Sequence, residues 1–176
     1  MSINNSNKRT GLIAQTYWGQ DPRQNIPPTL KLRALPTPFA VQSVPSSLTK
    51  TVQVDGENAF PCRRCLQDGK MGDFMLLAPY DPWLGDSPYR QPGPIFVHST
   101  PQCAPYKPDG LLPQQLRRRL ISVRCFDSAH CLVSADVVQG DELMRVSAKM
   151  MENEKAEYIH LHYARPGCFA VRIDRA

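Results

Sequence analysis

Short apolar segments alternate with polar, proline-punctuated stretches along this chain, and few of them are long enough for a helix. Positions 30–34 alternate apolar with basic side chains, as expected for a strand with one buried face. Residues 73–80 contain a continuous apolar run, which predicts a strand buried on both faces. By the same criteria we expect further strands at residues 51–54, 94–98, 121–126, 131–138, 156–163 and 168–173.

Two segments have the spacing of amphipathic helices instead. Residues 112–120 form the first, with Pro113 suitably placed in its first turn. The second is expected to begin at Gly140, with Asp141 as its capping residue. Its buried stripe is expected to consist of Leu143, Val146, Met150 and Met151.

Length and composition narrow the fold class. The chain has 176 residues, which suits one domain with its own core. Its 17 prolines are about twice the usual share and disfavour a helical bundle. We therefore predict a single α+β domain over residues 29–176, with a mixed, mostly antiparallel sheet of about six to eight strands, two helices and long proline-rich loops. Residues 1–28 are polar, end in two prolines and are expected to form a flexible N-terminal arm.

The net charge of +5 at pH 7 is modest. The compact basic run Arg117–Arg119 is typical of a solvated helix face, and no aromatic RNA-binding signature accompanies it. No signal peptide or membrane-spanning stretch is recognised, so we expect a cytoplasmic protein without nucleic-acid or membrane partners. In that compartment the six cysteines are expected to be thiols.

The segment near the C-terminus concentrates reactive side chains. His160 and His162 are one residue apart, so on a strand they share a face at roughly 6–7 Å. Arg165 and Cys168 flank the Pro-Gly turn that follows. Imidazoles titrate near neutrality and suit acid–base chemistry. The same pair also supplies half of a metal site, for which His98 is a candidate third ligand.

A second cluster is Cys62-Arg63-Arg64-Cys65, which has the spacing of metal ligands. A structural zinc site needs a second pair, and neither His98 with Cys103 nor His160 with His162 is the standard partner. A redox function is also disfavoured, because no helix begins at the first cysteine to lower the pKa of its thiol. Ordinary thiols are therefore the preferred interpretation.

A loop and a strand end add further candidates. In the loop 87–90, Tyr89 is a hydrogen-bond donor and Arg90 is suited to grip a carboxylate. His98 follows a predicted strand, where loops meet and sites form. The sequence has no dinucleotide-binding, phosphate-binding or serine-hydrolase motif. Proton transfer next to a carbonyl, without a cofactor, suits the side chains that remain.

Four motifs together resemble a bacterial family catalogued as domain of unknown function 1203. They are Phe60–Arg63, Asp86–Arg90, Gly93–His98 and His160–Cys168, and the resemblance extends from about Leu30 to Ile173. It implies that these motifs belong to one small bacterial domain. It does not imply a particular reaction.

The leading functional hypothesis is a small cofactor-independent enzyme of bacterial metabolism, secondary metabolism included. It would isomerise, cleave, condense or cyclise a carbonyl-bearing anion, as lyases, isomerases and cyclases do. The expected catalytic residues are His160, His162, His98, Cys62 and Cys168, and the expected substrate-binding residues are Arg63, Tyr89, Arg90 and Arg165. One alternative is a protein or enzyme that binds zinc or another divalent metal through His98, His160 and His162, and the other is a non-catalytic module that binds an anion or a peptide.

Overall fold

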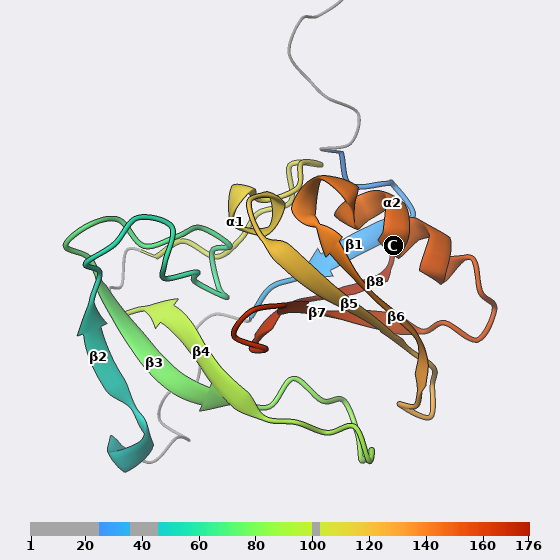
Figure 1. The fold of residues 1–176 in the computed structure, drawn as a ribbon, viewed down its shortest axis with the longest axis horizontal. Coiled ribbons are helices and arrows are strands. Elements are labelled where there is room, and N and C mark those ends of the chain that lie inside the picture. Colours follow the sequence, from blue (N-terminus) through green and yellow to red (C-terminus); the bar gives the residue numbers. More distant parts are fainter. Residues whose placement is uncertain (1–24, 36–45, 100–102) are drawn as a thin grey trace, which may run out of the picture.

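Eight strands form two antiparallel sheets in the computed structural model, which describes residues 25–35, 46–99 and 103–176 (Figure 1). The elements in chain order are β1 (Leu30–Arg33), η3 (Ser46–Leu48), β2 (Lys50–Gln53), β3 (Phe74–Tyr80), β4 (Gly93–His98), α1 (Gln114–Arg117), β5 (Leu120–Phe126), β6 (Leu132–Gln139), η4 (Gly140–Glu142), α2 (Leu143–Met151), β7 (Tyr158–Tyr163) and β8 (Phe169–Arg175). In the described part of the chain, no helix has the length and apolarity needed to cross a membrane.

The larger sheet has the strand order β1-β8-β7-β5-β6. Every residue of the central strand β7 is buried, because its two faces are covered as well as its two edges. The helix α2 packs against this sheet through Leu143, Met144, Val146 and Met151, and most of the hydrophobic core lies here. The sheet therefore positions the β7–β8 turn.

The smaller sheet has the order β2-β3-β4. Pro79 and Pro94 lie opposite each other in the β3–β4 ladder, and because proline cannot donate a hydrogen bond, regular pairing stops near this point. The irregular segment 61–68 joins β4 through a bridge between Cys62 and Phe96 and through a hydrogen bond from Arg63 N to Phe96 O of 3.0 Å. The core of this half is small and contains Cys62 itself.

The α+β class predicted from the sequence is confirmed, and so are the approximate positions of the strands. The strands divide between two sheets, however, instead of forming one mixed sheet. The predicted burial of β3 on both faces is wrong at Phe74, which is 48% exposed at the end of the hairpin. Residues 1–24 of the predicted arm lie outside the described residues, whereas Ile26 N donates to Gly110 O at 2.8 Å.

The helices also differ from expectation. The helix predicted at 112–120 is reduced to the single turn α1, because Leu120 already begins β5. Asp141 does not cap α2; it lies in η4 and binds Arg117 at 2.9 Å. Met150 is only half-buried, and Met144 takes its place in the buried stripe of α2.

Candidate functional site

The strand β7 places His160 and His162 on one face, with their ring centroids 6.3 Å apart. His160 is completely buried and its ring contacts several aromatic rings, and neither of its nitrogens has a hydrogen-bond partner among the described protein atoms. The surrounding rings are those of Trp83, Phe126, Tyr158 and Phe169. A substrate would have to displace this aromatic shell to reach His160.

Burial also determines the charge of both histidines. It lowers the pKa of His160 to about 3, and the neighbouring His162 adds to this effect. It lowers the pKa of His162 to about 4, although the contact with the Gly167 carbonyl acts in the opposite direction. The Nδ1 atom of His162 lies 3.0 Å from Gly167 O and is placed to donate to it. Both side chains are therefore neutral near pH 7, and His162 links β7 to the β7–β8 turn.

His98 does not join this pair. It lies with three cysteines at the end of β4, and the ligand atoms of Cys62, Cys65, His98 and Cys103 all lie within 4.8 Å of one another. Within residues 25–35, 46–99 and 103–176, this is the only group of three or more potential metal ligands at such distances. A metal site built from His98, His160 and His162 is consequently not assembled.

The cysteine group is partly enclosed. Cys62 is fully buried, while Cys65 and Cys103 are half-buried. Hydrogen bonding, chiefly from the Cys65 thiol and also from His98, lowers the pKa of the Cys62 thiol well below its usual range against the opposing effect of burial. The same proximity to Cys62 raises the pKa of His98.

Arg63, the residue after Cys62, is a buried cation. Its side chain is 1% exposed, and its Nε donates to Phe169 O at 2.8 Å. Its Nη1 donates to Pro61 O, and its Nη2 lies 3.0 Å from the Cys168 sulfur. The guanidinium also lies over the Tyr163 ring, 4.9 Å from its centroid. Arg63 thus holds the segment 61–65 against the final hairpin.

A pocket of about 510 Å³ opens beside Arg63, and we call it the arginine pocket. No aspartate or glutamate is among the described residues that line it. The lining includes Arg63, Arg118, Arg119, Tyr163, Arg165 and Cys168. Three of the residues expected to act at the site, Arg63, Arg165 and Cys168, are therefore brought together here.

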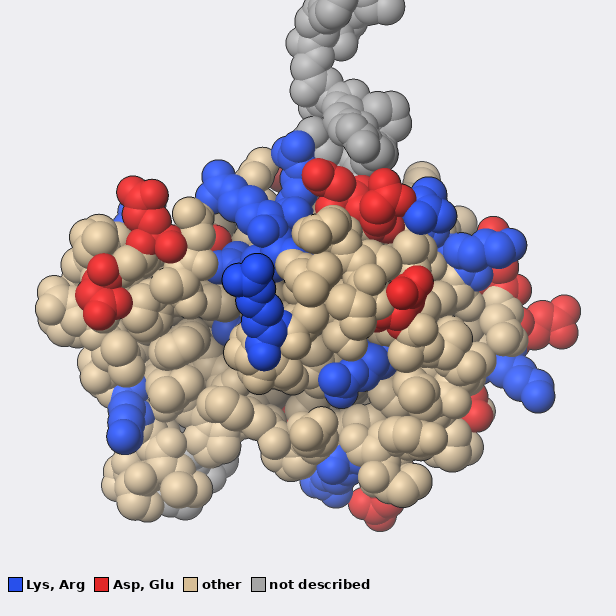
Figure 2. All heavy atoms as spheres, in the orientation of Figure 1, with Lys and Arg blue, Asp and Glu red and all other residues tan. Residues whose placement is uncertain are grey.

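Arg118, Arg119 and Tyr163 were not recognised as site residues from the sequence. The basic run 117–119 suggested a solvated face, but Arg119 turns inward and binds Asp68 at 2.7 Å. It lies over the Tyr163 ring, 5.2 Å from the centroid. Figure 2 shows basic side chains gathered around α1, consistent with the position of this run. The position of Tyr163 at the end of a predicted strand, shortly before the Pro-Gly turn, was the available signal.

Tyr89 and Arg90 lie apart from the arginine pocket. Both are exposed, and Arg90 is held by Asp81 at 2.6 Å and by Asp86 at 3.2 Å. They line a separate hollow of about 430 Å³ together with Trp83 and Arg124. Because two carboxylates already neutralise Arg90, its expected role in gripping an anion has little support.

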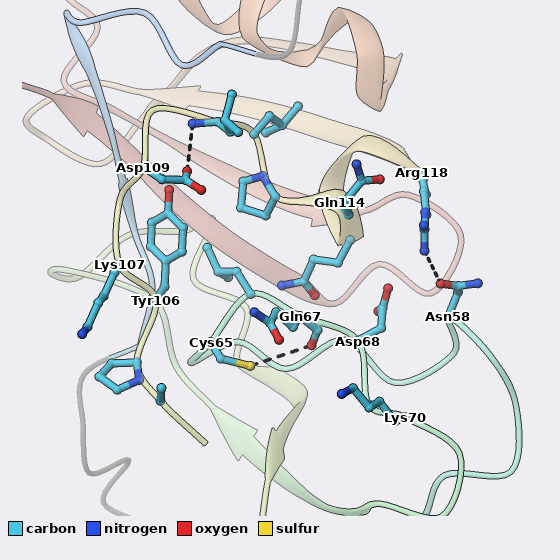
Figure 3. Close-up of a pocket in the computed structure, with 18 of the residues that line it drawn as sticks. Asn58, Cys65, Gln67, Asp68, Lys70, Tyr106, Lys107, Asp109, Gln114 and Arg118 are labelled. Carbon is cyan, nitrogen blue, oxygen red and sulfur yellow. Dashed lines mark hydrogen bonds between the residues drawn. The ribbon is translucent and has the colours of Figure 1, made fainter. Parts of the chain in front are cut away.

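A more open depression, of about 960 Å³, lies between residues 57–71 and 104–118. Figure 3 shows Cys65 and Gln67 in this depression, Tyr106 and Asp109 in the neighbouring loop, and Arg118 beside Asn58. Acidic and basic side chains alternate around it. Its mixed charge gives no preference for one class of ligand, in contrast to the arginine pocket.

Comparisons with known proteins identify a family for this chain. No curated protein and no solved structure matches the chain. Residues 59–175, which include the cysteine group, the arginine pocket and both histidines of β7, match the model of the family described as "Protein of unknown function (DUF1203)", and the chain belongs to that family.

Proposed function

We propose that this protein binds a small anionic molecule in the arginine pocket. The observation that carries the proposal is the burial of Arg63 without an acidic partner: among the described residues, no carboxylate pairs with it. An unpaired buried cation is costly, and an anion in the adjacent cavity would offset that cost.

The other arginines would extend this preference over the whole pocket. Arg119 is balanced by Asp68, but Arg118 contacts only the neutral Asn58 side chain. Arg165 is exposed and has no hydrogen-bonding or ionic partner among the described residues. Arg165 and Arg118 therefore have free donors for a carboxylate or a phosphate, and guanidinium groups bind both in fork geometry. The volume suits a metabolite-sized ligand.

A second candidate function is catalysis by Cys168 on a carbonyl group of the bound anion. The 3.0 Å contact between Arg63 Nη2 and the Cys168 sulfur favours it, because it holds a nucleophilic side chain at the wall of the pocket that would bind the anion. The sulfur would form a bond to the carbonyl carbon as the carbonyl π bond opens, the thiol proton would pass to solvent, and a neighbouring guanidinium would stabilise the resulting alkoxide. Acid–base chemistry at His160 has less support, because that ring is sealed and its pKa is low.

Calorimetric titration with inorganic phosphate, citrate and malonate tests the binding proposal. At least one of these anions is expected to bind wild-type protein, and Arg165→Ala is expected to weaken binding about tenfold, because a hydrogen bond to a charged group contributes about 1.5–3 kcal/mol. Arg145→Ala is the matched control, since Arg145 lies on α2 and pairs with Glu142 at 2.6 Å. Equal affinities in all three proteins, or no binding at all, would refute the proposal.

Alkylation with iodoacetamide in the same samples tests whether the Cys168 thiol lies at the binding site. A bound anion is expected to slow the modification of Cys168, which lines the pocket, and to leave the exposed Cys131 unaffected. Peptide mass spectrometry reads both sites in one digest. If the anion binds but both cysteines react at unchanged rates, Cys168 is not at the binding site. The proposal of catalysis by Cys168 then fails, whereas the proposal of anion binding stands.

A further inference from the structure

We propose that Cys62, Cys65, His98 and Cys103 bind a single zinc ion that stabilises the fold. These four side chains come from three separate segments, namely the turn 62–65, the end of β4 and the segment that contains Cys103. Their ligand atoms converge within 4.8 Å. Nothing in the proposed anion-binding function requires this convergence.

The separations match a tetrahedral zinc site. With Zn–S bonds of about 2.3 Å and Zn–N bonds of about 2.0–2.1 Å, tetrahedral angles place two sulfurs about 3.8 Å apart and a sulfur and a nitrogen about 3.6 Å apart. The Cys62 and Cys103 sulfurs lie 3.8 Å apart. The Cys65 sulfur and the His98 Nδ1 lie 3.5 Å apart. Two independent ligand pairs therefore have the spacing that one central ion requires.

The backbone around the cysteines also suits a metal site. Leu66 adopts a positive φ of 55° immediately after Cys65, which turns the chain back so that both sulfurs of the Cys-x-x-Cys segment point to one side. The His98 backbone N–H points at the Cys62 sulfur at 3.4 Å. Such a donor stabilises a thiolate ligand, because it supplies positive charge without adding a competing ligand.

The surroundings hold the remaining ligands in place. His98 directs Nδ1 to the cysteines and Nε2 to the Asp73 carboxylate, at 3.6 Å, which is the outer arrangement common for metal-binding histidines. The Arg64 guanidinium donates to the Cys103 carbonyl. Three thiolates around Zn²⁺ leave a net charge of −1, and the Arg64 cation lies beside it.

The ligand set identifies the metal and its role. Thiolates are too soft for calcium or magnesium, and three cysteines with one histidine form a well-known structural zinc set. An iron–sulfur cluster would hold its ligands farther apart, because its own iron and sulfide atoms lie between them. Four protein ligands complete the tetrahedron, so no position is open for a substrate and the ion is structural.

The smaller sheet has a small core that a bound ion would stabilise. Among the described residues its core has only six buried members, namely Leu35, Val54, Cys62, Met75, Ile95 and Val97. A core of this size stabilises a three-stranded sheet poorly without a cross-link. A zinc ion would add a cross-link between β4, the turn 62–65 and the segment around Cys103, beyond the few hydrogen bonds that join them.

Metal analysis of the purified, reduced full-length protein tests the proposal. Zinc is expected in a one-to-one ratio to the chain, and Cys65→Ser and Cys103→Ser are each expected to lose most of it. Cys131→Ser is the matched control, because Cys131 is exposed and lies outside the group. If the first two variants do not fold, cobalt titration of zinc-depleted wild-type protein replaces them. A one-to-one end point with intense visible bands is then expected, as for tetrahedral thiolate coordination.

Three results would overturn the proposal. The first is wild-type protein that carries no zinc and binds neither zinc nor cobalt in a one-to-one ratio. The second is a cobalt spectrum typical of octahedral oxygen or nitrogen coordination. The third is a Cys62–Cys103 disulfide in freshly purified protein, detected by mass spectrometry without reduction, since the two sulfurs are near enough for oxidation to compete with metal binding.

Discussion

His160 illustrates how a single buried residue can be misjudged from its chemistry alone. An imidazole beside a second imidazole suggests acid–base work, but this ring is enclosed by aromatic side chains and has no hydrogen-bond partner in the described part of the chain. An unsatisfied buried polar atom costs about 1–3 kcal/mol. His160 therefore makes the fold less stable than an apolar side chain of similar shape would.

The first prediction concerns the dependence of stability on pH. The folded pKa of His160, about 3, lies below its unfolded value, so the unfolded chain binds more protons between these two values. The free energy of unfolding contributed by His160 is therefore complete above about pH 6.5 and is lost as the pH falls towards about pH 3. Urea unfolding at about pH 7 and pH 5 should show that His160→Leu removes about 2 kcal/mol of this acid sensitivity.

A polar variant separates titration from burial. His160→Asn keeps a buried polar group that does not titrate. It should therefore flatten the pH dependence as His160→Leu does, yet be less stable than His160→Leu at both pH values. His160→Leu should leave stability at about pH 7 unchanged or higher. An unchanged pH slope in both variants would show that the pKa of His160 is the same in the folded and unfolded protein, which would contradict the prediction.

At the same scale, periodicity and burial are predictable to different extents. The alternation of strand side chains correctly placed His160 and His162 on one face, and the ring separation agrees with it. The low exposure of His160 was not predictable, because Trp83 arrives from a loop almost eighty residues earlier in the chain. Local pattern carries no information about which distant loop covers a strand.

At the scale of elements, η4 packs tightly against the end of α1 through Gly140. A Cβ atom at this position would lie far inside contact distance of the Leu116 and Arg117 carbonyl oxygens. These are backbone atoms, so no side-chain rotation can make room. The approach also brings Asp141 to Arg117, at 2.9 Å. Gly140 thereby sets the position of α1, and with it the positions of the arginines that follow.

The second prediction follows from this close packing. Gly140→Ala should lower the free energy of unfolding by about 1–3 kcal/mol, because the backbone of α1 or η4 must move. Gly93→Ala is the matched control, since its Cβ would meet no atom within 4 Å. Thermal and urea unfolding of both variants provides the comparison. A Gly140→Ala protein as stable as the control would mean that η4 can shift without cost.

The spacing of the proposed zinc ligands along the sequence was only partly informative. The turn Cys62-x-x-Cys65 and the pair His98-x₄-Cys103 were both visible, and the second lies within the spacing that zinc sites use. Neither this pair nor His160 with His162 is the standard partner of a Cys-x-x-Cys turn, so the sequence favours ordinary thiols. What joins the two pairs is the parallel bridge between Cys62 and Phe96, a tertiary contact that strand periodicity does not encode.

At the scale of the whole molecule, the two sheets differ in how they are stabilised. The larger sheet and α2 share a core of 18 buried residues among those the structure describes, whereas the smaller sheet has six. A buried hydrogen-bond relay connects the two halves. Gln115 Nε2 donates to Cys62 O at 3.1 Å, and Tyr163 Oη donates to Gln115 Oε1 at 3.0 Å. Gln115 therefore connects Cys62 of the proposed zinc site to Tyr163 of the arginine pocket.

The last prediction uses this asymmetry. If zinc stabilises the smaller sheet, its removal with a chelator should increase hydrogen exchange mainly at the amides of β3 and β4, because their core is too small to persist alone. The amides of β5 and β7 serve as the control within the same sample, since the larger core protects them without the metal. Peptide-level exchange measured by mass spectrometry resolves the two sheets. Equal loss of protection in both sheets would mean that they unfold as one cooperative unit. Unchanged exchange in β3 and β4 of metal-free protein would show that the smaller sheet does not depend on the ion.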